Sequence, residues 1–155
     1  MRFLGVGQTN DLGAMYHGLA QRGHEVKVFI ADQASRDVYG GMLETTADWR
    51  AELGWLRGAG EQGVALFESA DQGDEQDVLR RQGFQVIGGS ALGDRLEADR
   101  EFGQQALRAI GLHTALSHRF GGYPEAMEFL ARSPGRYVLK FNGASTDWNS
   151  RSESR

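Results

Sequence analysis

The chain has 155 residues, a formal net charge of -4 at pH 7, an ordinary apolar share of 40% and no cysteine. This length fits one compact domain with the start of a second, and the acidic balance gives no electrostatic footprint for nucleic acid. The lack of cysteine excludes disulfides, thiolate metal sites and a cysteine nucleophile, and no apolar run approaches the roughly 20 residues that cross a bilayer. We therefore expect a soluble, cytoplasmic protein with no nucleic-acid or membrane partner.

The first 90 residues alternate between strand and helix patterns. Short apolar or β-branched runs predict buried strands, and apolar residues at helical spacing predict the helices between them. The predicted strands are 3–6, 25–30, 63–67 and 84–87, with a short one near 42–44, and the helices are 12–19, 48–57 (Asp48 as N-cap) and 75–81. Such alternation predicts an α/β fold with a doubly wound, open parallel sheet of the Rossmann type.

The pattern changes after Ser90. A helical stretch over 91–110, broken near Gly93, is followed by a predicted strand over 113–120, a helix over 123–132 and a strand over 137–141. We therefore expect three regions: a Rossmann-like domain over 1–90, the beginning of a second subdomain over 91–142, and a polar, flexible tail over 143–155.

Four residues are predicted to lie at the carboxyl edge of the sheet, where ligands of open α/β proteins bind. Gly5 and Gly7 form a strand-to-helix loop that could hold a phosphate at a helix N-terminus, while Asp32 and Glu68 follow strands. The alternative is a tight turn with solvated acids. A dinucleotide fingerprint needs a third glycine where Asn10 stands, so the loop does not favour a nicotinamide cofactor.

Lys140 lies within the apolar run Tyr-Val-Leu-Lys-Phe. Its ammonium group needs an anion or a water-filled cleft, which suits a nucleotide-phosphate ligand. A lysine that protects an edge strand explains the pattern equally well.

Other catalytic patterns are absent from the sequence. The four histidines, His17, His24, His113 and His118, do not have the spacing of metal ligands, and no Gly-x-Ser-x-Gly nucleophile elbow occurs. We therefore assign no catalytic residue and no metal ligand.

Four segments in order resemble ATP-grasp ligases, most closely phosphoribosylamine–glycine ligase of purine biosynthesis. They are Gly83-Phe-Gln-Val-Ile-Gly-Gly-Ser90, Leu96-Glu-Ala-Asp-Arg100-Glu-Phe, Ala109-Ile-Gly-Leu-His-Thr114 and Tyr137-Val-Leu-Lys140. The resemblance implies a pre-ATP-grasp domain over 1–90 followed by the beginning of an ATP-grasp subdomain. It also implies that Lys140 and Arg100 bind the phosphates of ATP, with Gly5, Gly7, Asp32 and Glu68 facing the substrate.

In that family the glycine-rich lid and the acidic Mg²⁺ ligands come after the matching lysine. The resemblance therefore implies an N-terminal fragment or shortened relative of an ATP-dependent carboxylate–amine ligase, which needs ATP and Mg²⁺ when complete and is inactive alone. The alternatives are a stand-alone Rossmann-like domain that binds a nucleotide or sugar phosphate, and a non-catalytic interaction module. In the last case an incomplete second domain would expose apolar surface and favour a homodimer.

Overall fold

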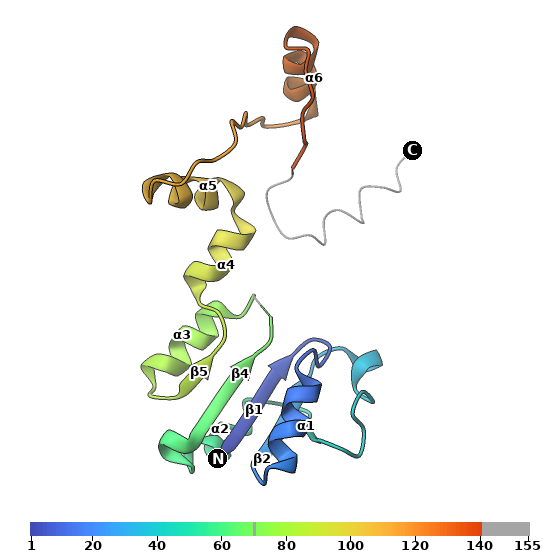
Figure 1. Cartoon of the computed structure of the whole chain (residues 1–155), viewed down its shortest axis with the longest axis vertical. Helices are drawn as coiled ribbons and strands as arrows, with labels where there is room; N and C mark the ends of the chain where they lie inside the picture. Colours follow the sequence, from blue (N-terminus) through green and yellow to red (C-terminus); the bar gives the residue numbers. More distant parts are fainter. Residues whose placement is uncertain (70, 141–155) are drawn as a thin grey trace. The chain divides into compact units, whose positions relative to one another are not determined.

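The computed structural model describes residues 1–69 and 71–140 of the chain. The chain divides into two compact units, Met1–Asp94 and Arg95–Arg155, and each is described by itself (Figure 1). Within the described residues, no helix is long and apolar enough to cross a membrane.

The first unit is built on a five-stranded parallel sheet, which confirms the predicted α/β class (Figure 1). In the strand order β3-β2-β1-β4-β5, β2 and β3 lie on one side of β1, and β4 and β5 lie on the other. The connections that follow β1 and β4 therefore cross opposite faces of the sheet. The strands are β1 (Arg2–Gly7), β2 (Glu25–Ile30), β3 (Glu44–Thr46), β4 (Gly63–Phe67) and β5 (Gln85–Ile87).

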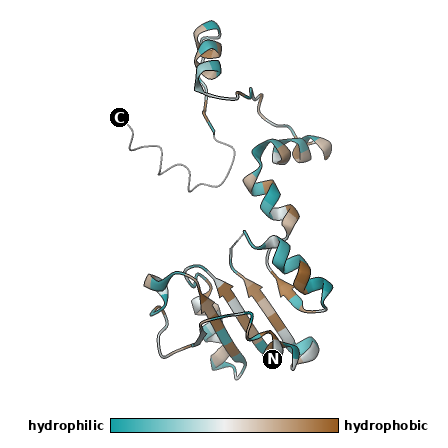
Figure 2. Cartoon of the chain, turned by 180° about the vertical axis from the view of Figure 1, so that it is seen from behind, coloured by the Kyte–Doolittle hydropathy of each residue, from teal (hydrophilic) through white to brown (hydrophobic). Residues whose placement is uncertain are grey.

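Helices cover both faces of this sheet, as a doubly wound fold requires. Alternate strand residues point to opposite faces, so β1, β2 and β4 each contribute to two separate apolar clusters. Figure 2 shows hydrophobic residues along the strands of this sheet. One cluster packs against α1 (Gly13–Gln21), and the other packs against α2 (Leu53–Arg57) and α3 (Gly73–Arg81). Two short 3₁₀ turns, η1 (Gln33–Ser35) and η2 (Gly60–Gln62), complete the connections.

Tyr16 on α1 packs directly against the backbone of β1 at Gly5. The Tyr16 side chain is fully buried, and a β-carbon at Gly5 would lie 2.5 Å from Cζ of its ring. That distance is too short for any real carbon pair, so only glycine at position 5 lets the helix approach the sheet this closely. The glycine that was predicted to shape a loop therefore also sets the packing of the core.

Two boundaries in the first unit differ from the prediction. The short strand near 42–44 lies instead at β3, Glu44–Thr46. The helix predicted to begin at Asp48 begins at Leu53, because the Asp48 carboxylate accepts the Arg50 N–H and closes a turn rather than capping a helix.

The described residues of the second unit contain α5 (Arg100–Ala109), α6 (Tyr123–Arg132) and the end of α4 (Ala91–Ala98), which starts in the preceding unit. The break in the predicted helix over 91–110 lies at Asp99 rather than near Gly93. The Asp99 carboxylate accepts the N–H groups of Glu101 and Phe102 and thereby starts α5. Gly93 lies in the first turn of α4, where the Ser90 hydroxyl accepts its N–H.

The strands predicted over 113–120 and 137–141 do not form in the described part of the second unit. Residues 113–120 and 136–140 have no strand hydrogen bonding, and Phe141 lies outside the described residues. An apolar run becomes a strand only when a neighbouring strand completes its hydrogen bonds, and the described residues of this unit provide none. Large apolar side chains accordingly stay exposed there, among them Leu116, Met127 and Val138.

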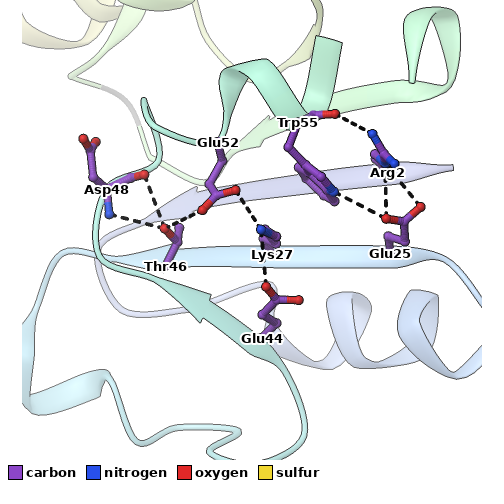
Figure 3. Close-up of polar contacts among 8 residues, drawn as sticks. All are labelled: Arg2, Glu25, Lys27, Glu44, Thr46, Asp48, Glu52 and Trp55. Carbon is purple, nitrogen blue, oxygen red and sulfur yellow. Dashed lines mark hydrogen bonds and ion pairs between the residues drawn. The ribbon is translucent and has the colours of Figure 1, made fainter. Parts of the chain in front are cut away.

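A network of charged side chains joins α2 to the sheet on the first unit (Figure 3). Lys27 Nζ lies 2.8 Å from the Glu52 carboxylate and 3.3 Å from that of Glu44. Arg2 pairs with Glu25 and donates to the Trp55 carbonyl oxygen. Both cations also lie over the Trp55 ring, so the indole is held between two positive charges.

This network makes the stability of the first unit sensitive to acid. The hydrogen bond from Lys27 holds the pKa of Glu52 below its usual range. A carboxyl group whose pKa is lowered by folding stabilises the native state above its unfolded pKa of about 4.3, and the contribution disappears as the pH falls through the folded value. We expect Glu52→Gln to lower the urea midpoint at about pH 7, and the gap to the wild type to shrink as the pH falls through the lowered pKa of Glu52. The exposed Glu61→Gln is the matched control, and a gap that does not change with pH would contradict the role of Glu52.

The close approach at Gly5 predicts a large effect of one methyl group. We expect Gly5→Ala to lower the free energy of unfolding by about 1–3 kcal/mol, because the buried Tyr16 ring must move. Gly54→Ala is the control, since a β-carbon there meets nothing within 4 Å and Gly54 lies in α2. Alanine at that position should be neutral or stabilise by up to about 1 kcal/mol. Urea denaturation measures both, and equal stability of the two variants would refute the packing argument.

Candidate functional site

The structure brings three of the six predicted site residues, Gly7, Asp32 and Glu68, to the carboxyl edge of the first unit, whereas Gly5 lies within β1 beneath the Tyr16 ring. Backbone N–H groups of Ala31 and Asp32 donate to Gly7 and Gln8, while that of Glu68 donates to Val6. The ends of β1, β2 and β4 are thereby joined side by side. Because β1 and β4 flank the reversal of strand order, this is the position where open α/β sheets bind ligands.

The space beside Gly7 is filled by the side chain of Glu68. Phe67, the last residue of β4, pairs with Val6, so Glu68 follows directly beside Gly7, and a β-carbon on Gly7 would lie 2.3 Å from Glu68 Oε2. The same oxygen accepts the backbone N–H of Asp11 at 2.8 Å. A carboxylate of the protein itself therefore takes a loop N–H that a bound anion would use.

The hydroxyl of Tyr16 lies close to this carboxylate. Burial and the nearby Glu68 raise the pKa of the Tyr16 hydroxyl, so it stays protonated at every physiological pH. The Tyr16 hydroxyl also interacts with Glu68 as a hydrogen-bond partner, although the buried hydroxyl oxygen and the buried Glu68 Oε1 have no partner of strict hydrogen-bond geometry among the described residues. The sequence indicated Tyr16 only as an apolar helix position, because its proximity to Glu68 depends on packing across Gly5.

Asn10 is a second site residue that sequence reasoning did not select. It adopts a left-handed backbone conformation with φ of 63°, which asparagine tolerates better than most residues. Its amide Nδ2 donates to the Val38 carbonyl oxygen, and the ring of Tyr39 packs against Gly13 at the start of α1. In the sequence, Asn10 follows the Gly5-Val-Gly7 segment, and it was noted only because a dinucleotide fingerprint has its third glycine at that position.

Asp32 is engaged in local structure at the end of β2. Its carboxylate accepts from the Ser35 hydroxyl at 2.6 Å and from the Ala34 N–H, and these bonds start η1. The hydrogen bond from Ser35 is the main cause that holds the pKa of Asp32 below its usual range. Asp32 therefore adds a negative charge to the edge, while Ser35 and Ala34 occupy hydrogen-bonding positions around its carboxylate.

A buried polar group lies beyond β5. Gln76 on α3 is fully buried, and a β-carbon on Gly88 would overlap its side-chain oxygen, so Gly88 must be glycine. Asp94 accepts the Gly73 N–H at 2.6 Å, and Asp77 accepts the N–H of Ala91. These contacts tie the start of α4 to α3 and position the loop after β5.

The other two predicted residues belong to the second unit. Arg100 is the first residue of α5 and lines a cavity of about 410 Å³ with apolar side chains of α4 and α5. Lys140 is exposed and lies outside any strand. Their role as ATP-phosphate ligands stays a prediction. No group of three histidine or acidic side chains in the described residues could hold a metal ion.

Together, the fold and the edge define an α/β protein of doubly wound topology, in which the carboxyl ends of β1 and β4 are the position where such sheets bind ligands. No protein-family model and no curated protein sequence matches the chain. A solved structure of N5-carboxyaminoimidazole synthetase from Staphylococcus aureus in complex with ADP has a TM-score of 0.53 and 17% identity, over 84% of this chain. A second structure of that synthetase has a TM-score of 0.51 and 18% identity, over 83% of this chain.

This likeness concerns the fold. The chain spans 36% of the length of the ADP-bound synthetase and 35% of the other. The described architecture is therefore similar to about a third of a synthetase that has been solved with ADP, while the resemblance to phosphoribosylamine–glycine ligase stays a prediction.

The contact between Glu68 and Asp11 can be measured directly. We expect Glu68→Ala to expose the Asp11 N–H and to speed its hydrogen exchange about fivefold, equivalent to about 1 kcal/mol for one lost hydrogen bond. Glu61→Ala, which removes an exposed carboxylate before β4, should leave that exchange rate unchanged. NMR-detected exchange provides the readout, and unchanged Asp11 protection in Glu68→Ala would show that the loop does not depend on Glu68.

Proposed function

We propose that this chain is the front portion of an ATP-dependent carboxylate–amine ligase of the ATP-grasp type. The observation that carries the proposal is the fold likeness, over 84% of the chain, to a synthetase solved with ADP. The ordered motif resemblance, from the Gly83–Ser90 segment to Lys140, points independently to the same class. In the complete enzyme, ATP phosphorylates a carboxylate and an amine then displaces the phosphate.

Each unit has a separate part in this proposal. The carboxyl edge of the first unit, with Gly7, Asp32 and Glu68, faces the acceptor substrate. Arg100 and Lys140 in the second unit contact the phosphates of ATP, whose charge Mg²⁺ neutralises in the complete enzyme. Phosphoribosylamine–glycine ligase chemistry is the particular reaction that the motif resemblance suggests.

One observation favours a second candidate, a stand-alone domain that binds a nucleotide or sugar phosphate. The five-stranded sheet of the first unit is already covered by helices on both faces. Such a unit can position a ligand at its edge without help from the rest of the chain. The two candidates differ in whether residues of the second unit affect nucleotide binding.

Ligand-dependent stability separates them. We expect Mg-ATP to raise the melting temperature of the 155-residue chain more than ribose 5-phosphate or a nicotinamide dinucleotide does. Lys140→Ala and Arg100→Ala should each weaken Mg-ATP binding about three- to tenfold, because each removes one charged phosphate contact. Arg132→Ala is the control, since Arg132 pairs with Glu128 on α6.

The same preparation should release phosphate from ATP no faster than buffer does. A coding region that continues past Arg155 should encode a glycine-rich lid and paired acidic residues. Turnover at enzymatic rates by the 155-residue chain would refute the proposal of a fragment that is inactive alone. Stabilisation by ribose 5-phosphate alone, unaffected by either variant, would favour the stand-alone binding domain.

A further inference from the structure

The connection between η1 and β3 contains a strap, residues 36–43, that lies against the first turn of α1. Both ends of the strap are anchored to the rest of the first unit. Arg36 Nε donates to the last carbonyl oxygen of β2, and Leu43 packs against the apolar cluster that faces α1. Between these ends the backbone forms successive turns, and the side chains of Val38 and Met42 are exposed. The middle of the strap therefore lies between two fixed ends and has little apolar anchoring of its own.

Two contacts hold the strap against the protein. The side-chain amide of Asn10 donates to the Val38 carbonyl oxygen at 3.2 Å. The ring of Tyr39 fits against Gly13, where a β-carbon would lie 2.5 Å from Cε2 of the ring, and its centroid lies 6.2 Å from that of His17. Asn10 belongs to the loop after β1 and is only 5% exposed. The strap therefore covers part of a loop that forms the carboxyl edge of the sheet.

The closed strap contains unfavourable features that opening would relieve. Tyr39 has φ of 64°, in the left-handed region that bulky side chains rarely adopt. Asn10 Oδ1 is buried without a hydrogen-bond partner among the described residues, so this acceptor has lost its hydration without compensation. Gly41, with φ of 75°, adopts its conformation easily and can serve as a hinge. Opening would let Tyr39 relax and let water reach Asn10, which offsets part of the energy needed to break the two contacts.

We infer that the middle of the strap, residues 37–42, opens away from α1 as one unit while the sheet stays folded, and that the closed strap limits access to the loop after β1. Segments with few buried apolar contacts open at a much lower free energy than the core does. The limit on access rests on the proposed function, in which the carboxyl edge faces the acceptor substrate, whereas the opening itself does not depend on it.

Hydrogen exchange measured by NMR on the full 155-residue chain tests the opening. The N–H groups of Met42 and Leu43 both donate to the Tyr39 carbonyl oxygen, so they report on the strap. They should exchange at least about tenfold faster than the N–H groups of β1. A low concentration of urea that speeds exchange in β1 should leave the rates of these two groups unchanged, because opening of the strap exposes little surface.

Two variants should open the strap from different sides. Asn10→Gly keeps the left-handed backbone at that position and removes the donor to the strap. Gly41→Ala adds a methyl group that meets nothing within 4 Å, but it strains a backbone with φ of 75°. Each variant should speed the exchange of the Met42 and Leu43 N–H groups about fivefold, because one net hydrogen bond or one unstrained left-handed residue is lost.

Glu52→Gln is the control for global unfolding. It weakens the charged network at α2, on the other face of the sheet, and that network is intact whether the strap is open or closed. It should therefore speed exchange in β1 and leave the strap N–H groups unchanged. Tyr39→Phe, which keeps the ring against Gly13, should exchange as the wild type does.

A neutral soluble nitroxide, which broadens the NMR signals of groups that it can reach, measures access to the edge. Gly41→Ala should increase the broadening of the Gly13 N–H and of the Asn10 side-chain amide, because both lie under the strap. The N–H of Leu4, within the buried part of β1, should stay unaffected. Faster strap exchange without this added broadening would overturn the proposed limit on access.

Unchanged exchange of the strap N–H groups in both Asn10→Gly and Gly41→Ala would overturn the inference. Faster strap exchange in Glu52→Gln would also overturn it, since the strap would then open only when the whole unit unfolds. If Asn10→Gly does not fold, Gly41→Ala provides the test by itself, because it removes no side-chain contact. None of these measurements contains ATP, so failure here leaves the ATP-dependent stabilisation of the chain as an independent result.

Discussion

Two glycines of β1, Gly5 and Gly7, decide how the first unit is assembled, because neither has a β-carbon. At Gly5 the missing atom leaves room for the Tyr16 ring, which brings α1 onto the sheet, and at Gly7 it leaves room for the Glu68 carboxylate. Both side chains enter from different elements and meet at the same edge. The packing of the core and the chemistry of the edge therefore depend on the same short strand.

Because Glu68 follows β4 and Tyr16 lies on α1, the pair joins β4 to the helix that follows β1, and β1 and β4 are the strands that flank the reversal of strand order. Sheets of this topology bind ligands at that edge, and in this chain the Asp11 N–H there is already bonded to the Glu68 carboxylate. Fold likeness to an ADP-bound synthetase and an acidic first-unit edge are compatible, because the proposed ATP ligands, Arg100 and Lys140, belong to the other unit.

The two units differ in how much of their structure is local. The first buries apolar residues on both faces of a sheet, and its charged network around Lys27 and Trp55 holds α2 in place. In the described part of the second unit, the helices form through local signals such as the Asp99 cap, while large apolar side chains remain exposed. Helices need only their own backbone, whereas strands need neighbours, so the strands predicted over 113–120 and 137–141 are the elements that do not form in the described residues.

The sequence by itself determined the α/β class, four of the five strands near their observed positions, and the gathering of Gly7, Asp32 and Glu68 at one edge, because parallel strands end together. It also indicated α6 from its apolar spacing and Pro124. Only the tertiary structure decided that the loop after β1 holds a carboxylate, that Asn10 is buried and that Tyr16 lies beside Glu68. Those outcomes depend on contacts between residues far apart in the chain, 28 positions for Asn10 and Val38 and 57 for Asp11 and Glu68, and no local pattern records such contacts.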